Sequence, residues 1–137
     1  MTDFTVTGAG EVLVYLIEGT AIPGKGALFI ALFTGDPGAT GTPSNEVSDS
    51  GTAYTRQPLV GAFTALTSSR TATTDADITW TTATASWGAV THIGIMNTVT
   101  QNTVAGSCLF HTAVTSTTVG DGDQAKITAG NLTITLN

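Results

Sequence analysis

The stretch that decides the fold, residues 27–58, reads ALFIALFTGDPGATGTPSNEVSDSGTAYTRQP. It opens with an unbroken apolar run at 28–33, which ends at the turn-forming sequence TGDPG. A short apolar run bounded by Gly, Asp and Pro is typical of a strand buried on both faces, and it is too short to span a membrane. We therefore predict a central strand at 28–33. We also predict a long polar loop at 35–53, the part most available to act outside the core.

Before this stretch, the spacing of apolar residues predicts one short helix over 7–18. The apolar positions recur at i, i+3, i+4, i+7 and i+8, which is one helical face, and they are Ala9, Val12, Leu13, Leu16 and Ile17. Thr7 is expected as the N-cap and Gly19 as the residue after the C-cap. The apolar face must pack on a sheet or on a partner chain.

After residue 53 the chain alternates between short strand patterns and turn signals. Strands are expected at 54–63, with Pro58 at an edge or a bulge, and then at 78–81, 92–96, 106–111, 125–128 and 132–136. Residues 64–76 and 120–123 are polar and predicted as turns. About seven to eight short strands predict an all-β protein, a β-sandwich or jelly roll, forming one domain over 1–137.

Composition and charge exclude several classes of function. The formal net charge is −6 and the chain has only four basic residues, whereas phosphate binding requires several Lys or Arg on one surface. We expect no nucleic-acid binding and no attachment to an anionic membrane. Cys108 is the single cysteine, so no intrachain disulfide is expected. The N-terminus has no signal-peptide pattern, and synthesis in the cytoplasm is expected.

No residue pattern predicts catalysis, a metal or a cofactor. Cys108 and His111 are three apart, which on a strand places them on opposite faces, and His92 is predicted as a hydrogen-bonded strand residue. The Asp pairs at 75 and 77 and at 121 and 123 lack the full calcium-loop pattern and are predicted as solvated turns. We therefore predict a protein that is not an enzyme.

Arg56 is the most informative charged residue because it directly follows the long loop. We expect it to pin the loop through an ion pair or bidentate hydrogen bonds, with Asp36 or Glu46 as the partner. A structural role for Arg56 is favoured over a functional one.

Several segments carry a resemblance that extends over nearly the whole chain. The sequences ALFTGDPG, NEVS, AYTRQ, SWGAVTHIGI and AGNLTITL resemble a family of small structural proteins of tailed-bacteriophage virions, of the tail-fibre-like or head cement-decoration type. The resemblance implies a virion location and partners among other virion subunits, such as the major capsid protein.

Within that family we expect a capsid cement or decoration protein, because the chain has no coiled-coil heptads and no fibrous repeat. The alternative is a tail or tail-fibre component, possibly a module that binds host glycans. A homo-oligomer, with a trimer favoured, would suit symmetric sites. The candidate partner contacts are Tyr54, Arg56, Phe63, Trp80 and Trp87. If the long loop reaches a partner, deleting 38–51 should leave the chain folded and abolish particle binding.

Overall fold

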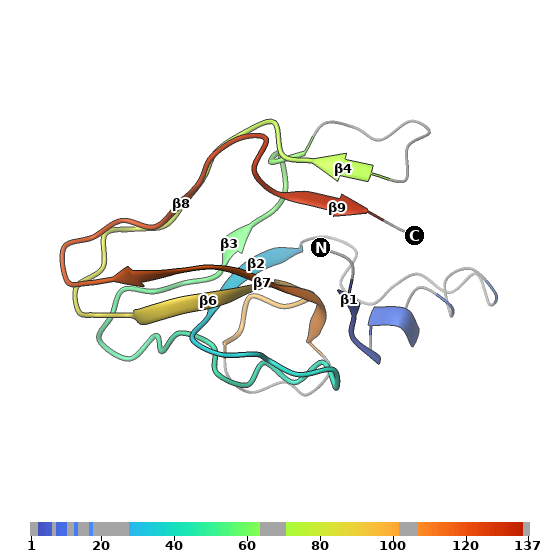
Figure 1. Cartoon of the computed structure of the whole chain (residues 1–137), viewed down its shortest axis with the longest axis horizontal. Coiled ribbons are helices and arrows are strands. Elements are labelled where there is room, and N and C mark those ends of the chain that lie inside the picture. Colours follow the sequence, from blue (N-terminus) through green and yellow to red (C-terminus); the bar gives the residue numbers. More distant parts are fainter. Residues whose placement is uncertain are drawn as a thin grey trace.

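The computed structural model describes residues 3–6, 8–10, 13, 17, 28–63, 71–101 and 107–135. Within these residues all strand pairing is antiparallel and forms three sheets (Figure 1). The largest has five strands in the order β1-β7-β6-β2-β3, and two smaller ladders pair β4 with β9 and β5 with β8. The strands are β1 Asp3–Phe4, β2 Phe29–Phe33, β3 Gln57–Pro58, β4 Thr71–Thr73, β5 Ile78–Thr79, β6 Gly88–Met96, β7 Cys108–Val119, β8 Lys126–Ile127 and β9 Thr133–Thr135. The all-β prediction is confirmed.

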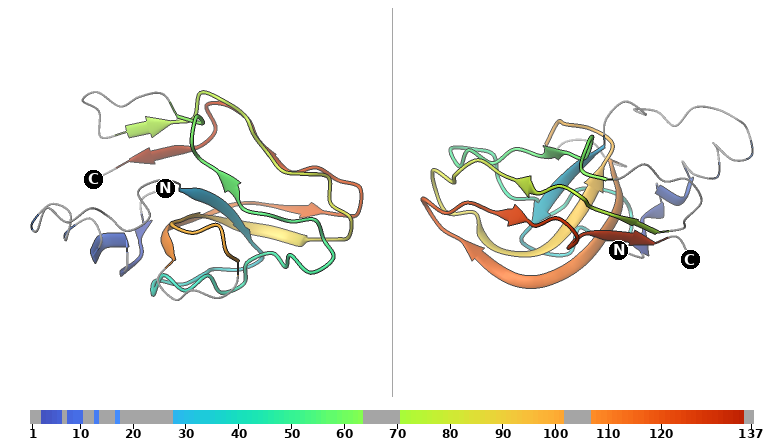
Figure 2. Two further views of the ribbon diagram at one scale, coloured as in Figure 1. Left: turned by 180° about the vertical axis from the view of Figure 1, so that it is seen from behind. Right: turned by 90° about the horizontal axis from the view of Figure 1, so that it is seen from above.

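The main core lies between the five-stranded sheet and the two ladders, so the protein has two layers (Figure 2). Leu32 and Ile95 contribute from the large sheet, while Ile78, Trp80 and Leu132 contribute from the second layer, all almost fully buried.

The strand predicted at 28–33 forms as β2, and its burial on both faces is confirmed. It pairs along its whole length with β6, which holds the middle of the sheet, and Ala31 lies opposite Gly94. A Cβ on Gly94 would lie 2.8 Å from the Phe33 ring and 3.2 Å from Cys108 Sγ. Glycine at this position therefore leaves room for the Phe33 ring and the Cys108 sulfur to pack directly against the strand.

A second, smaller apolar cluster covers the opposite face of the large sheet. It consists of Ala31, Phe33, Met96 and Cys108, with Phe29 packed against it. The loop 35–53 runs along this side, because Gly41 O accepts the Cys108 N–H and a β-bridge joins Phe33 to Glu46.

The N-terminal segment is helical at the described positions 6, 8–10, 13 and 17, while the remaining positions of the predicted helix 7–18, with Thr7 and Gly19, lie outside the described residues. Among the described residues, Thr5 caps this segment: its Oγ1 accepts the Gly8 N–H at 3.0 Å and its carbonyl accepts the Ala9 N–H. A Cβ on Gly8 would lie 2.3 Å from Leu109 O, so only glycine lets the helix start lie this close to β7.

Several strand predictions need correction. Within 54–63 only β3, Gln57–Pro58, pairs as a strand, and it is an edge strand, as predicted for Pro58. β6 begins at Gly88, before the predicted start at 92. The segment 64–76 was predicted as a turn but contains β4, whose threonines pair with those of β9. β7 is twelve residues long and continues through the Thr-rich segment to Val119. That the whole chain forms one domain stays a prediction.

Candidate contact surfaces and the loop anchor

The long loop is anchored by a buried ion pair between Glu46 and Arg56. Arg56 Nε donates to Glu46 Oε1 at 2.8 Å and Nη2 donates to Oε2 at 2.7 Å, with both side chains fully inaccessible. Nη1 donates to Thr98 O at 2.8 Å, which joins the loop to the end of β6. This is the bidentate geometry in which Arg binds a carboxylate most strongly. The expected pinning role is present, with Glu46 rather than Asp36 as the partner.

Tyr54 completes the anchor from the other side of the carboxylate. Its hydroxyl accepts the Leu32 N–H at 2.8 Å and donates to Glu46 Oε1 at 3.4 Å. Burial, and then the charge of Glu46, raise the pKa of Tyr54 far above its ordinary value, so the phenol stays protonated. The loop, β2 and the segment after the loop therefore share one hydrogen-bonded network.

The loop 35–53 is consequently part of the interior. Val47 is 1% exposed and belongs to the main core, and its N–H donates to Leu32 O. Deleting 38–51 would remove Glu46 and Val47 and leave the Arg56 guanidinium buried without its carboxylate. We therefore expect the deletion to destabilise the chain strongly rather than leave it folded, because a buried unpaired charge is strongly destabilising.

The five predicted contact residues lie mostly in the interior of the single chain. Tyr54, Arg56, Trp80 and Trp87 are at most 4% exposed, and Phe63 is half-buried. Trp87 Nε1 donates to Thr52 O at 2.8 Å, and its ring meets Tyr54 edge-on at 5.3 Å. Their role as partner contacts stays a prediction; the structure shows them packing the core and fixing the loop.

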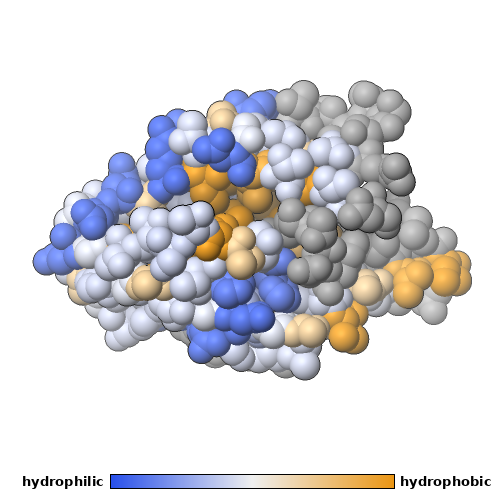
Figure 3. All heavy atoms as spheres, viewed as in Figure 1, coloured by the Kyte–Doolittle hydropathy of each residue, from blue (hydrophilic) through white to orange (hydrophobic). Residues whose placement is uncertain are grey.

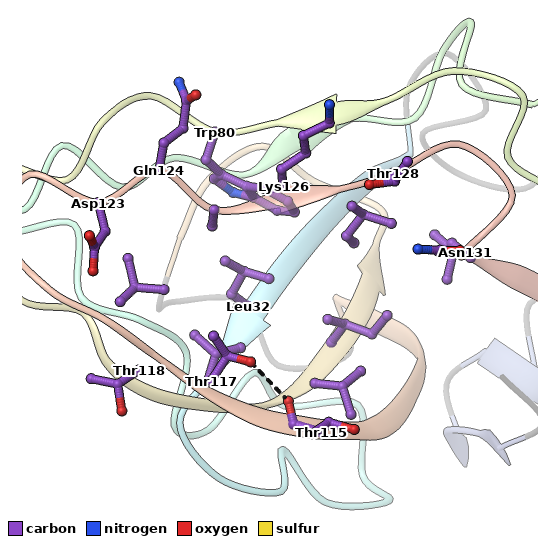
Figure 4. Close-up of a pocket in the computed structure, with 17 residues that line it drawn as sticks. Leu32, Trp80, Thr115, Thr117, Thr118, Asp123, Gln124, Lys126, Thr128 and Asn131 are labelled. Carbon is purple, nitrogen blue, oxygen red and sulfur yellow. Dashed lines mark hydrogen bonds between the residues drawn. The ribbon is translucent and has the colours of Figure 1, made fainter.

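A surface that the sequence did not reveal lies on the other side of the sandwich. A groove with a volume of about 620 Å³ opens between β7 and the segment 123–132 (Figure 4). Its floor is apolar and nearly inaccessible, formed by Leu32, Trp80, Val90, Ile93 and Leu132. One wall is the end of β7, 114–119, where Thr115, Thr117 and Thr118 point around the opening; the other is 123–128 with Gln124 and Lys126. Figure 3 shows this hollow, with apolar atoms at its base between polar ridges.

Trp80 contributes an unusual polar group to the groove floor. Its Nε1 is buried, and within the part of the chain that the structure describes it has no hydrogen-bond partner. Buried donors in proteins are nearly always paired, so this one stands apart from the paired indole of Trp87.

A second exposed apolar surface lies in the N-terminal segment, at Val6, Leu13 and Ile17, of which Leu13 and Ile17 belong to the predicted apolar face. Their exposed fractions are 74%, 54% and 77%. We call them the arm stripe. Apolar atoms are prominent in Figure 3 at the end of the molecule where this helix lies.

The remaining candidate groups have structural partners. Burial raises the pKa of the Cys108 thiol to about 12, so Cys108 is a core residue and not a ready nucleophile. His92 Nδ1 lies 2.9 Å from Thr91 Oγ1, and His111 Nδ1 lies 3.6 Å from Asp36 Oδ1. No group of three or more His, Cys, Asp or Glu that could hold a metal occurs among the described residues.

The acidic pairs serve as turn caps and links between strands. Asp123 accepts the Gly120 N–H at 2.8 Å, which closes the turn between β7 and β8. Asp77 lies 2.5 Å from Lys126 Nζ and accepts the Ala129 N–H at 2.9 Å, and these two bonds lower the pKa of Asp77.

Sequence patterns could have indicated the groove only in part. The uncharged run of Thr, Ser and Val at 114–119, followed directly by a Gly-Asp turn, is the strand signal that was missed. The floor residues come from distant parts of the chain, and only the topology brings them together.

Fold and surfaces together describe an all-β protein whose loop is built into its interior and whose exposed apolar surfaces lie elsewhere. The chain matches, over residues 4–135, the family model described as podophage GP4 fiber I protein gp80, and it belongs to that family. Membership supports a structural role in a phage virion and a location there. A search of curated proteins finds no match. Within the described residues no helix is long and apolar enough to cross a membrane.

Proposed function

We propose that this chain is a non-enzymatic structural subunit of the fibre or tail of a phage virion. The observation that carries the proposal is the family match, which extends over residues 4–135 and whose description names a fibre protein. The interior supports it: Cys108 is buried in the core, Arg56 is paired with Glu46, and Asp77 and Asp123 accept backbone hydrogen bonds.

Capsid cement, which the sequence had favoured, is the second candidate. The small, folded two-layer body suits a shell-bound protein as well as a fibre base, and the apolar groove and arm stripe could meet either kind of neighbour. Of the predicted contacts, half-buried Phe63 is the one that retains surface for a partner. Tyr54, Arg56, Trp80 and Trp87 would act by holding the surrounding surface in shape.

The test is the position of the protein on intact virions, by gold-labelled antibody or by fitting the fold into a cryo-EM map. Label confined to the tail or its fibres is the expected result. Density repeated over the shell would contradict the fibre proposal and support cement. With tail label, a glycan array probed with the purified chain would then test whether the subunit also binds host sugars.

A further inference from the structure

We propose that the groove receives an extended strand from a neighbouring virion subunit, which pairs with the outer edge of β7 and places its apolar side chains on the groove floor. This inference rests on the proposed function, a structural role in the virion, and names the kind of contact that the subunit makes there. It holds on the fibre, the tail or the shell. The observation that carries it is that an open strand edge and an apolar groove lie side by side.

The outer edge of β7 is open along much of the strand. β6 pairs with one side of β7 as far as Val119, whereas β1 pairs with the other side only at Phe110 and His111. Over 112–118 no strand among the described residues pairs with that outer side, and residues 113–118 are all exposed. Figure 2 shows β7 as the outermost strand of the curved sheet there. The unpaired backbone N–H and C=O groups of such an edge are a template for another strand.

β1 shows that this edge accepts an antiparallel strand. Directly after β1, the Thr5 N–H donates to Leu109 O at 2.9 Å. Because backbone groups alternate in direction along a strand, those of Ala113 point to the same side as those of Leu109. An added strand would therefore lie in line with β1, and we expect it to be antiparallel, like every strand pair among the described residues.

The edge lacks the side chains that protect most strand edges from pairing. Residues 112–118 read TAVTSTT, without a charged residue and without proline. One bulge is present: the register between β6 and β7 shifts between Val90 and His92, which places residues 114–116 in the bulge. A bulge bends its strand, and regular pairing resumes at Thr117. We therefore expect the partner's backbone to pair on either side of the bulge.

The groove determines which kind of strand fits. It opens between this edge and the segment 123–132, so a strand paired with β7 would lie over the floor that includes Leu32, Ile93 and Leu132 (Figure 4). Successive side chains of a strand point to opposite faces, so every second side chain of the partner would enter the groove. Since the floor is apolar, those side chains should be apolar and the alternate ones polar. A strand that docks by backbone pairing and alternate pockets is a known mode of peptide recognition.

Charge defines one end of the partner strand. The turn 120–123 lies at the end of β7 and carries Asp121 and Asp123, both exposed, and Asp123 lines the groove. Lys126 on the same wall is already paired with Asp77. A partner that is uncharged along β7 and carries a Lys or Arg at the turn would complement this surface. An antiparallel strand begins at the turn, so the basic residue should precede the apolar alternation.

The first test measures incorporation into virions. A tagged variant subunit is supplied beside the wild-type subunit during infection, and mass spectrometry of purified virions gives the ratio of the two. Thr117→Lys should lower the incorporated fraction at least about tenfold, because a charged side chain on a strand edge opposes pairing. Thr100→Lys is the matched control at an exposed threonine outside the groove and should incorporate like wild type. Both threonines are exposed, so thermal unfolding of the purified variants should match wild type.

The second test identifies the occupant. A photo-crosslinking residue, p-benzoylphenylalanine, replaces Thr115 on the groove wall, and the same residue at Thr100 measures the background. In virions, the residue at the wall should crosslink to a segment of another virion subunit in which apolar and polar residues alternate after a Lys or Arg. A cryo-EM map should show that segment as a strand beside β7.

Three outcomes would overturn the inference. The first is a folded Thr117→Lys subunit that incorporates as well as Thr100→Lys. The second is a residue at Thr115 that crosslinks no more than the one at Thr100. The third is a crosslinked segment that is helical or that belongs to a second copy of this chain. The position of wild-type subunits on the virion tests the proposed function separately, so either idea can fail while the other stands.

Discussion

Two ion pairs on opposite sides of the molecule show how differently its two sides are built. Glu46 and Arg56 are fully buried on the loop side and share two hydrogen bonds, with a third from Arg56 to Thr98 O. Asp77 and Lys126 lie beside the groove with their side chains 42% and 46% exposed, joined at 2.5 Å. The first pair fixes a loop within the core, whereas the second is a surface link between Asp77, just before β5, and Lys126 of β8.

The difference shows that a segment with a polar sequence can be buried in this protein, while a largely uncharged segment can line an open surface. The loop side is polar in sequence and closed in structure, because Glu46, Arg56 and Tyr54 are buried together as hydrogen-bond partners. The groove side exposes an opening above an apolar floor. The side that looked functional in the sequence is structural, and the side that looked ordinary carries the accessible apolar surface.

The largest expected effect comes from breaking the buried pair. Arg56→Met should lower the free energy of unfolding by about 3–5 kcal/mol, because the Glu46 carboxylate is left buried without a counter-charge. Chemical denaturation monitored by tryptophan fluorescence would measure it, since Trp87 contacts Tyr54 of the same network.

The matched control is the double variant Glu46→Leu with Arg56→Met. Replacing a buried pair by apolar residues of similar size is often nearly neutral, so the double variant should regain a large part of the lost stability. A double variant no more stable than Arg56→Met would show that burial of the carboxylate is not the cause.

The next largest loss of stability is expected from a substitution at Gly94, in the middle strand of the five-stranded sheet. Gly94→Ala should cost about 1–3 kcal/mol, because the added Cβ collides with the Phe33 ring and lies 3.3 Å from Phe110 O, a backbone atom that cannot swing away. Gly10→Ala is the control, since nothing lies within 4 Å of its added Cβ, and it should be neutral or slightly stabilising in a helix. Equal loss in both variants would contradict the steric explanation.

The two buried tryptophans allow the loop side and the groove side to be compared through a single hydrogen bond, that of the indole N–H. Trp87→Phe leaves Thr52 O without its donor, whereas Trp80→Phe removes a donor that has no partner among the described residues. Both variants lose similar ring volume, so Trp87→Phe should be the more destabilising by about 1–3 kcal/mol. Thermal unfolding of the two variants side by side would measure the difference; a larger loss at Trp80 would indicate that the groove-floor indole has a partner in solution.

Local patterns in the sequence predicted the parts of this fold that depend on local physics. The apolar run became β2, the turn at 120–123 formed, and Arg56 next to the loop did pin it through Glu46. Long-range pairing could not be predicted: β4 forms within a polar segment because its threonines meet those of β9, and the groove exists because Trp80, Leu32 and Leu132 converge. The cap at Thr5 could not be predicted either, because it depends on the approach of Gly8 to the backbone of Leu109, which is distant in sequence.

The smallest expected effect is at the exposed pair, Asp77 and Lys126, and it tests whether burial is what distinguishes this pair from Glu46 and Arg56. In Lys126→Met the pKa of Asp77 should rise back toward its ordinary value, but not completely, because the Ala129 N–H still donates to the carboxylate. A carboxyl whose pKa is lowered on folding contributes stability above its unfolded pKa of about 3.9, and that contribution is lost as the pH falls through the folded value. Lys126→Met should therefore shift the NMR titration of Asp77 and slightly flatten the acid limb of the stability curve, with almost no change at neutral pH, because exposed pairs are screened by solvent. If this variant were instead as unstable at neutral pH as Arg56→Met, burial would not be the property that separates the two pairs.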